Sequence, residues 1–269
     1  VRGLMGLMLL AATTGAWFGF DTAQAESTFW ARQVGGAIAA LLAGALGYGL
    51  VFMSAEGLSR MAFGWQPQLW KLWSRQGGSS LQTLGRTAGG YLFIPVELGL
   101  VAVFYYVTNT YLHWWQPSSE MTDPNVLSSA VPALAPIAMS LQAGFMEECL
   151  FRAIPLSLGA LIGAHFGRKR AGIAVAFVLQ ALVFGAAHAN YPGFPPYSRL
   201  VELIVPSMIW AAIFLRFGLL PTILLHACFD LSLFAIPVFL VDAPGAWVQR
   251  ALIIVAGAVP LIVVVARRV

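Results

Sequence analysis

Hydrophobic residues in this chain of 269 residues gather in long runs that short polar segments separate. The runs show none of the strict alternation between apolar and polar positions that is typical of a transmembrane β-barrel strand. Most of them approach the roughly 20 residues with which an α-helix crosses a hydrocarbon core about 30 Å thick. The pattern predicts about eight membrane-spanning helices, over residues 4–20, 34–53, 91–112, 131–162, 171–187, 200–215, 219–240 and 251–266.

The composition agrees with this interpretation. Hydrophobic residues make up 59% of the chain and charged residues only 10%, whereas soluble domains carry roughly 25% charged residues. An ordinary water-soluble domain is therefore excluded. Because only helices and closed barrels satisfy their backbone hydrogen bonds in lipid, we expect an all-α fold, a polytopic transmembrane helical bundle.

The net charge of +4 follows the predicted topology. Nearly all Lys and Arg residues outside the apolar runs fall in every second hydrophilic segment. The positive-inside rule then places both termini in the cytoplasm. We therefore expect this basic chain to meet the lipid bilayer and no nucleic acid.

The chain shows no internal repeat, and one long insertion interrupts its spans. We expect N-terminal transmembrane helices over residues 1–130, a core over 131–245 and a C-terminal transmembrane helix over 246–269. The insertion, residues 56–90, is expected in the cytoplasm. Its tryptophans alternate with cations, which is typical of an interfacial helix lying on the bilayer. A solvated loop whose aromatic residues anchor the neighbouring spans is the alternative.

Ionisable residues inside the apolar runs form three groups. An ionisable side chain near the middle of a span costs at least about 2.5–3.5 kcal/mol, so such residues are functional candidates. The groups lie in the fourth, fifth and seventh runs, and comprise Glu147, Glu148 and Arg152; Phe184 and His188; and His226 and Asp230.

Helical spacing predicts contacts within each group. Glu148 and Arg152 are four residues apart, so we expect them to form an ion pair on one helix face. Glu147 points about 100° away from Glu148 around the helix, so we expect it to face a cavity rather than to pair with Arg152. The same spacing of four places Phe184 beside His188, and His226 beside Asp230.

Three of these side chains, Glu147, His188 and His226, are suited to chemistry on a water molecule. A buried carboxylate or imidazole acts as a general base, and two imidazoles with a carboxylate hold a divalent metal such as Zn. Asp230 is then either a fourth ligand or the group that orients His226. The alternative for each residue alone is an interhelical hydrogen bond or a structural ion pair. Cys149 as a nucleophile is disfavoured because apolar neighbours suppress the thiolate.

The three groups together resemble the motifs of the CPBP intramembrane protease family, which includes the type II CAAX prenyl endopeptidases and the bacterial Abi proteins. The motifs are Glu-Glu-x-x-x-Arg, Phe-x-x-x-His and His-x-x-x-Asn-like, and here they read Glu147-Glu148-x-x-x-Arg152, Phe184-x-x-x-His188 and His226-x-x-x-Asp230. Three such motifs in order, on separate spans, are specific. The resemblance covers roughly residues 135–240.

The resemblance implies an endopeptidase that cuts a membrane-associated protein or peptide inside or at the edge of the membrane. Glu147 and His188 would activate water, and His226 with residue 230 would stabilise the oxyanion. Glu148, Arg152 and Phe184 would support that geometry. The family has been described both as metal-dependent and as a glutamate protease, and the resemblance also implies the bacterial inner membrane.

Asp230 departs from the family pattern, in which an Asn is often found. An ionised Asp cannot donate a hydrogen bond to an oxyanion. Asp230 is therefore protonated, or orients His226 as a charged partner, or ligates a metal, and the departure slightly favours the metal.

The depth of the histidines adds a further expectation. His188 lies about 26 Å along its span from the cytoplasmic end and His226 only about 11 Å. A shared site therefore requires the turn around residues 216–218 to lie away from the membrane surface.

Two functions of other classes remain open from the residues alone. Chains of Asp, Glu and His also form proton pathways in transporters, although the inverted repeat of many transporters is missing. A scaffold that binds a partner's transmembrane helix without cleaving it is the other. Among the remaining acidic residues, Glu97 is expected either to face the same cavity or to extend toward the membrane surface, and Glu202 is expected, like Arg216, at a membrane boundary.

Overall fold

The computed structural model describes residues 3, 6, 25–64, 69–116 and 124–268. The first predicted span, 4–20, lies outside the described residues except for Gly6. The described part is all-α and contains no strand. Its elements are α2 (Glu26–Phe63), η1 (Leu69–Trp73), α3 (Arg75–Gly78), α4 (Leu81–Tyr111), η3 (Pro124–Ser128), α5 (Leu134–Glu147), the π-helix η4 (Glu148–Ala153), α6 (Ile154–His165), α7 (Lys169–Ala187), α8 (Ser198–Phe217), α9 (Leu219–Phe234), α10 (Ile236–Leu240) and α11 (Ala246–Ala266).

Five described helices are long and apolar enough to cross a membrane: α2, α4, α7, α8 and α11. Two of the predicted spans are interrupted instead. Residues 131–162 divide into α5, η4 and α6, and residues 219–240 divide into α9 and α10. A proline follows each interruption, Pro155 in the first turn of α6 and Pro237 in the first turn of α10. Because proline lacks the backbone N–H and its ring crowds the preceding turn, a regular helix does not continue through it unchanged.

The insertion at residues 56–90 forms no long interfacial helix in the described part of the chain. Helix α2 runs on to Phe63 and α4 begins at Leu81, so the flanking helices take up much of the insertion. Between them lie η1, which contains Trp70 and Trp73, and the single turn α3. Trp65 lies outside the described residues.

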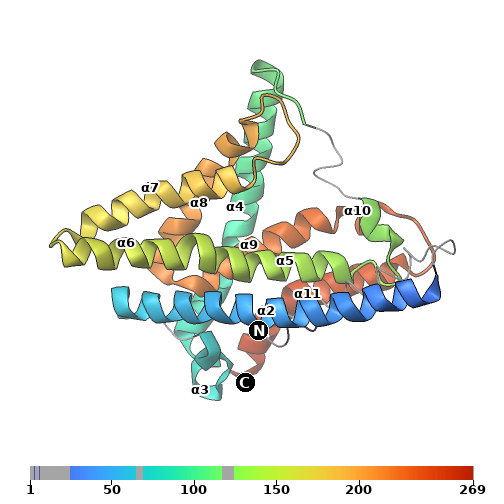
Figure 1. Cartoon of the computed structure of the whole chain (residues 1–269), viewed down its shortest axis with the longest axis horizontal. Helices are drawn as coiled ribbons and strands as arrows, with labels where there is room; N and C mark the ends of the chain where they lie inside the picture. The colour runs from blue at the N-terminus through green and yellow to red at the C-terminus, as the bar shows by residue number, and fades with distance from the viewer. Residues whose placement is uncertain (1–2, 4–5, 7–24, 65–68, 117–123, 269) are drawn as a thin grey trace.

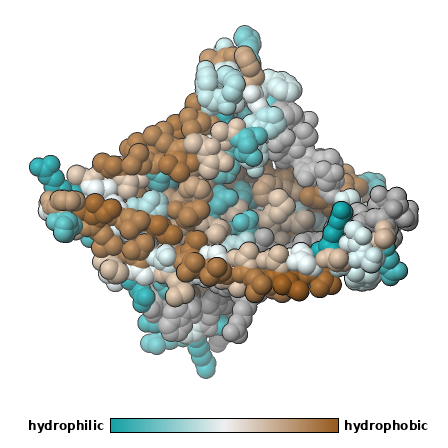
Figure 2. Space-filling view, viewed as in Figure 1, coloured by the Kyte–Doolittle hydropathy of each residue, from teal (hydrophilic) through white to brown (hydrophobic). Residues whose placement is uncertain are grey.

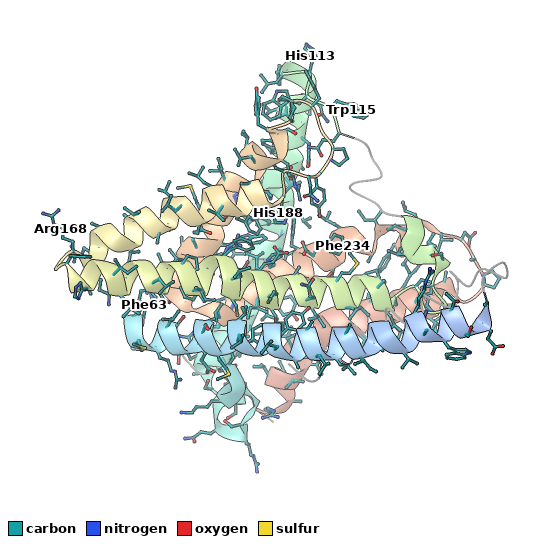
Figure 3. All side chains as sticks on the ribbon, viewed as in Figure 1. Phe63, His113, Trp115, Arg168, His188 and Phe234 are labelled. Atoms are coloured by element: carbon teal, nitrogen blue, oxygen red, sulfur yellow. The ribbon has the colours of Figure 1, made fainter. Side chains whose placement is uncertain are left out.

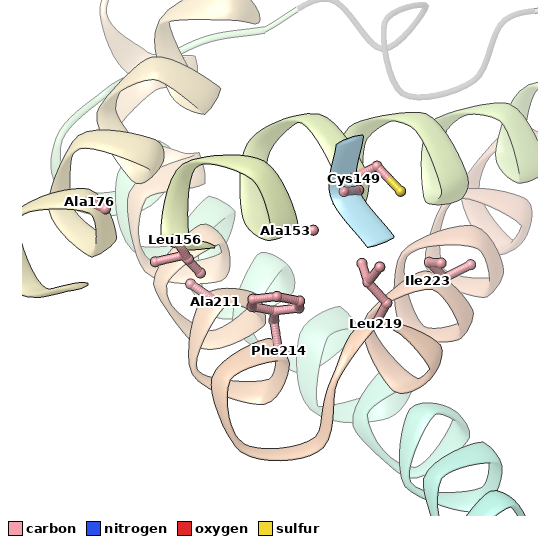
Figure 4. Packing of buried hydrophobic residues seen from close by; sticks show 9 residues of the cluster. Cys149, Ala153, Leu156, Ala176, Ala211, Phe214, Leu219 and Ile223 are labelled. Carbon is pink, nitrogen blue, oxygen red and sulfur yellow. The ribbon is translucent and has the colours of Figure 1, made fainter. Parts of the chain in front are cut away.

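Helix α9 forms the core of the bundle. Eight of its first nine residues are buried, as expected for a helix that is hydrophobic all round. Helices α4, α5 and α8 pack against it, and α6 packs between α2 and α7 (Figure 1). Figure 4 shows how Cys149 and Leu156 face Phe214 of α8 and Ile223 of α9 in one apolar cluster.

Glycines bring these helices unusually close together. A Cβ at Gly144 of α5 would lie 2.8 Å from the Cβ of Ala227 and 3.0 Å from the carbonyl oxygen of Ile223, both in α9. A Cβ at Gly90 of α4 would lie 2.9 Å from the Cβ of Leu224. Small residues allow such close backbone approach between membrane helices. The turns of α4 and α5 that follow are therefore held directly against α9.

The outer surface of the bundle is apolar. Large hydrophobic side chains along α2, including Val34, Leu42, Leu46 and Met53, are exposed. Figure 2 shows hydrophobic residues covering much of one face, with hydrophilic residues gathered at the projecting ends. So large an exposed apolar surface is atypical of a soluble monomer. Together with the apolar helices, it indicates an integral membrane protein.

The close contact at Gly144 predicts a selective effect of one methyl group. We expect Gly144→Ala to lower the free energy of unfolding by about 1–3 kcal/mol, because the new Cβ meets another Cβ and backbone atoms that cannot rotate away. Gly99→Ala in α4 is the matched control, since nothing lies within 4 Å of its Cβ position, and alanine is the better helix former. Thermal unfolding of both variants in detergent micelles tests this. Equal unfolding temperatures would contradict the close approach.

Candidate active site

A cavity of about 230 Å³ lies where α4, α5, α7, α8 and α9 meet. Two of its lining residues, His188 at the end of α7 and Phe234 at the end of α9, are labelled in Figure 3. The polar residues that line it are Glu97, Gln116, Gln142, Glu147, His188, Tyr191, Ser198, Arg199, Glu202, His226 and Asp230. The cavity thus collects the candidate residues of three separate motifs.

The π-helix η4 begins at the two adjacent glutamates. Glu147 ends α5 and Glu148 is the first residue of η4. Single π-helical turns inside α-helices widen the helix and are frequent at functional sites. Pro155 has no backbone N–H, so the carbonyl of Phe151 loses its helical hydrogen-bond donor, and this accounts for the interruption. Glu147 lines the cavity, whereas Glu148 is fully buried behind it.

His226 contacts three carboxylates. Its Nδ1 lies 2.8 Å from Oε1 of Glu148. Its Nε2 lies 3.4 Å from Oδ2 of Asp230 and 3.8 Å from Oε2 of Glu147. As expected from helical spacing, Glu147 does not pair with Arg152 and lines the cavity instead, but both glutamates also contact His226. The imidazole has two nitrogens on opposite edges, so two carboxylates that point in different directions both reach it.

Arg152 balances the charge of Glu148 inside the bundle. Both side chains are fully buried, and Nη1 of Arg152 lies 3.4 Å from Oε1 of Glu148. Nη2 donates to Oγ of Ser207, which in turn donates to Oε1 of Gln180. The guanidinium carbon lies 3.9 Å from the centroid of the Phe184 ring. The predicted spacing of four thus produces the ion pair, and α7 and α8 complete its surroundings.

His188 caps the end of α7. The last turn tightens, so that the backbone N–H of His188 donates to the carbonyl of Gly185 at 3.1 Å. The carbonyl of Phe184 then accepts from Nδ1 of the His188 ring, at 2.8 Å. A carbonyl oxygen only accepts, so this bond assigns the hydrogen to Nδ1. The centroid of the Phe184 ring lies 4.6 Å from that of the imidazole. Nε2 of His188 lies 3.8 Å from Oε2 of Glu147.

The structure brings together every residue of the predicted site. Glu147, His188 and His226 meet across the cavity although they come from three separate helices. In the turn before α9, Arg216 and Phe217 are exposed, whereas Gly218 and Leu219 are buried. Its position relative to the bilayer surface stays a prediction.

Trp210 escaped the sequence reasoning, whereas Glu97 takes the cavity position, one of the two expected for it. The ring centroid of Trp210 in α8 lies 4.3 Å from that of His226, and Trp210 Nε1 donates to Oε2 of Glu97 at 3.2 Å. Glu97 is 2% exposed. A lone carboxylate in the middle of an apolar run was the signal for Glu97, but nothing in the sequence indicated its partner.

Glu202 and Cys149 are both buried. Glu202, whose place at a membrane boundary stays a prediction, accepts from the hydroxyl of Tyr105 at 2.8 Å and from Nη1 of Arg199 at 2.6 Å. The carboxylate lies inside the bundle because these two donors compensate its burial. Cys149 is buried in the apolar cluster on α8 and α9 and does not line the cavity, which leaves the thiol no access to a substrate.

The metal expectation receives no support from the spacing of the side chains. Within residues 25–64, 69–116 and 124–268, no group of three or more His, Cys, Asp or Glu is placed to hold a metal ion. Glu147, His188, His226 and Asp230 are the residues that such an ion would need. We therefore derive no catalytic step through a metal.

In a comparison with known proteins, the region that carries the site matches one protein family. Residues 129–232 match the family described as type II CAAX prenyl endopeptidase Rce1-like. No curated protein and no solved structure matched the chain. The matched region contains all seven motif residues, and the match supports a CPBP-family protease. That family implies proteolysis of a membrane-associated protein.

The buried ion pair predicts a large loss of stability in Arg152→Met. The substitution leaves Glu148 buried without its cation, and breaking a buried pair in this way costs about 3–5 kcal/mol. The double variant Glu148→Gln with Arg152→Met removes both charges, so we expect it to recover part of the loss. Arg168→Met, at an exposed arginine, is the matched control. The measurement is the free energy of unfolding in mixed micelles, and wild-type stability of Arg152→Met would contradict the pairing.

Proposed function

We propose that this chain is an intramembrane endopeptidase that hydrolyses a peptide bond through a water activated by Glu147 and His188. One observation carries the proposal. Oε2 of Glu147 is buried without a hydrogen-bond partner among the described residues, and it faces Nε2 of both His188 and His226 at 3.8 Å. Buried carboxylate oxygens normally have a partner. A substrate water is the partner that this arrangement suits.

The distances agree with a bridging water. A separation of 3.8 Å is too long for a direct hydrogen bond, and it is of the size that one water spans between two polar atoms. The cavity has room for such a water beside a substrate carbonyl, since its volume of about 230 Å³ is many times the roughly 10–15 Å³ that one water needs on this measure.

His188 is suited to accept a hydrogen bond from that water. Because its Nδ1–H donates to the carbonyl of Phe184, the neutral ring presents the lone pair of Nε2 to the cavity. Glu147 takes the proton of the water as the oxygen attacks the substrate carbonyl carbon. The same proton then passes to the leaving amine as the carbon–nitrogen bond breaks. The products are a carboxylic acid and an amine, and the acid then loses its remaining proton to water.

His226 is suited to stabilise the oxyanion. A cationic imidazole donates from both nitrogens, and its Nδ1–H donates to Glu148. The Nε2–H is then directed into the cavity, toward the oxygen on which negative charge develops. Asp230 does not need to donate to the oxyanion in this arrangement. It acts as a charged partner 3.4 Å from Nε2 that favours the cationic ring.

The first test is cleavage by purified protein in lipid vesicles. Two fluorogenic probes cover the substrate class: a farnesylated peptide ending in a CAAX sequence, and an unprenylated transmembrane peptide. We expect Glu147→Gln and His188→Ala to lower kcat by about 10²–10⁴-fold, as loss of a general base does. We expect His226→Ala to lower kcat by about 10²–10³-fold, as loss of an oxyanion donor does.

His165→Ala and Glu26→Gln, at positions far from the cavity lining, are the matched controls and should cleave like wild type. Full activity of Glu147→Gln would overturn the catalytic assignment. If the wild-type chain cleaves neither probe but conducts protons across the same vesicles, the transporter interpretation replaces this one.

The second test concerns the metal. Since the described residues offer no metal-binding group, we expect cleavage to persist after dialysis against a chelator and to show no gain on addition of Zn²⁺. Loss of cleavage on chelation, with recovery on Zn²⁺ addition, would show instead that the four cavity residues hold a metal ion. The metal content of the active protein, measured by mass spectrometry, gives the same answer without relying on turnover.

A further inference from the structure

Glu97 is a third buried glutamate at the cavity, and the proposed reaction gives it no role. It lies in α4, outside the matched residues 129–232. It follows Gly90 by seven residues, which is two helical turns, so the two lie on the same face of α4. At Gly90, α4 lies close against α9, since a Cβ there would lie 2.9 Å from the Cβ of Leu224. The carboxylate of Glu97 is thereby directed toward the core of the bundle.

The carboxylate holds a tryptophan that packs against the proposed oxyanion donor. Oε2 of Glu97 accepts from Nε1 of Trp210 at 3.2 Å. Trp210 is 3% exposed, and its ring lies 4.3 Å from the imidazole of His226. Trp210 also contacts Arg152, whose guanidinium carbon lies 4.9 Å from the ring centroid. Trp210 therefore touches both the cation of the buried ion pair and His226.

We infer that Glu97 is a positioning residue: through Trp210 it fixes the imidazole of His226 in the orientation that directs Nε2 into the cavity. Glu148 holds one edge of the imidazole by a hydrogen bond. That bond fixes the Nδ1 edge, and the Trp210 side chain packed beside the ring limits how far the Nε2 edge can tilt. Trp210 can do so only while its own orientation is fixed. The bond to Glu97 supplies this, because a buried indole N–H takes up the position in which it finds an acceptor.

The inference rests on the proposed function and assigns the first helices of the bundle a part in catalysis. The matched region supplies Glu147, His188 and His226, and α4 supplies the group that holds one wall of their cavity. A chain reduced to the matched region would carry every motif residue and lack this restraint.

The experiment compares two substitutions of Glu97 on whichever probe the wild-type chain cleaves. Glu97→Gln keeps an oxygen acceptor for Trp210, so we expect kcat within about threefold of wild type. Glu97→Leu keeps the approximate volume and removes the acceptor. We expect kcat to fall about tenfold, the effect of one lost buried hydrogen bond, with KM changed less than twofold.

A double-mutant cycle tests the route through Trp210. Trp210→Phe keeps an aromatic wall and removes the donor, so its kcat should also fall. Adding Glu97→Leu to Trp210→Phe should lower kcat by less than twofold further, because the bond is already absent. Independent, multiplicative losses would overturn the inference.

Other outcomes identify different roles for Glu97. A rise in KM with unchanged kcat would show that Glu97 binds substrate. A lowered unfolding temperature with normal kcat in the folded fraction would show a structural role alone, and equal losses in Glu97→Gln and Glu97→Leu would show that charge matters. Each contradicts the inference. The proposed function fails separately, if Glu147→Gln retains full activity in the same vesicles.

Discussion

The fully buried contact of Glu148 with Arg152 and His226 is the interaction on which the rest of the site depends. A carboxylate and a guanidinium without any exposure are costly to place inside an apolar bundle unless each has a partner. Here Glu148 contacts both Arg152 and His226, and Arg152 also contacts Ser207 and the face of Phe184. These partners come from η4, α7, α8 and α9. The two charges pair within η4, but their remaining partners are present only when α7, α8 and α9 are in place, so the network favours this arrangement of the helices.

The local irregularities of the bundle serve this arrangement. The π-helix lets two adjacent glutamates approach different nitrogens of one imidazole. The tightened end of α7 frees a backbone carbonyl, which fixes the His188 ring. Gly144 allows α5 to approach α9 so closely that the following turn reaches His226. Each departure from a regular helix thus places one polar side chain at the cavity, where a regular helix would leave it misdirected.

The apolar surroundings also explain how few groups the proposed reaction needs. Inside a bundle of low polarity, charges interact more strongly than in water, and prealigned donors need little reorganisation as negative charge develops. One carboxylate and two oriented imidazoles are then sufficient for attack by water and stabilisation of the oxyanion. The orientation of each imidazole comes from a neighbour outside the reacting set: the Phe184 carbonyl for His188, and Glu148 for His226. Trp210 adds a second restraint on His226 in the inferred arrangement.

The sequence by itself determined the membrane class, the all-α fold and the seven motif residues, because runs of apolar residues and isolated charges inside them are local features. Contacts four residues apart, such as Glu148 with Arg152, were also predictable, since helix geometry alone produces them. Only the tertiary structure decided that His226 joins both glutamates, that Glu202 is buried, and that Trp210 and Glu97 belong to the site. These contacts join helices distant in the chain, and their geometry depends on where prolines and glycines change the course of each helix. The periodicity of the sequence predicts which face of a helix a residue occupies, but only the packing of the helices determines which residues that face contacts.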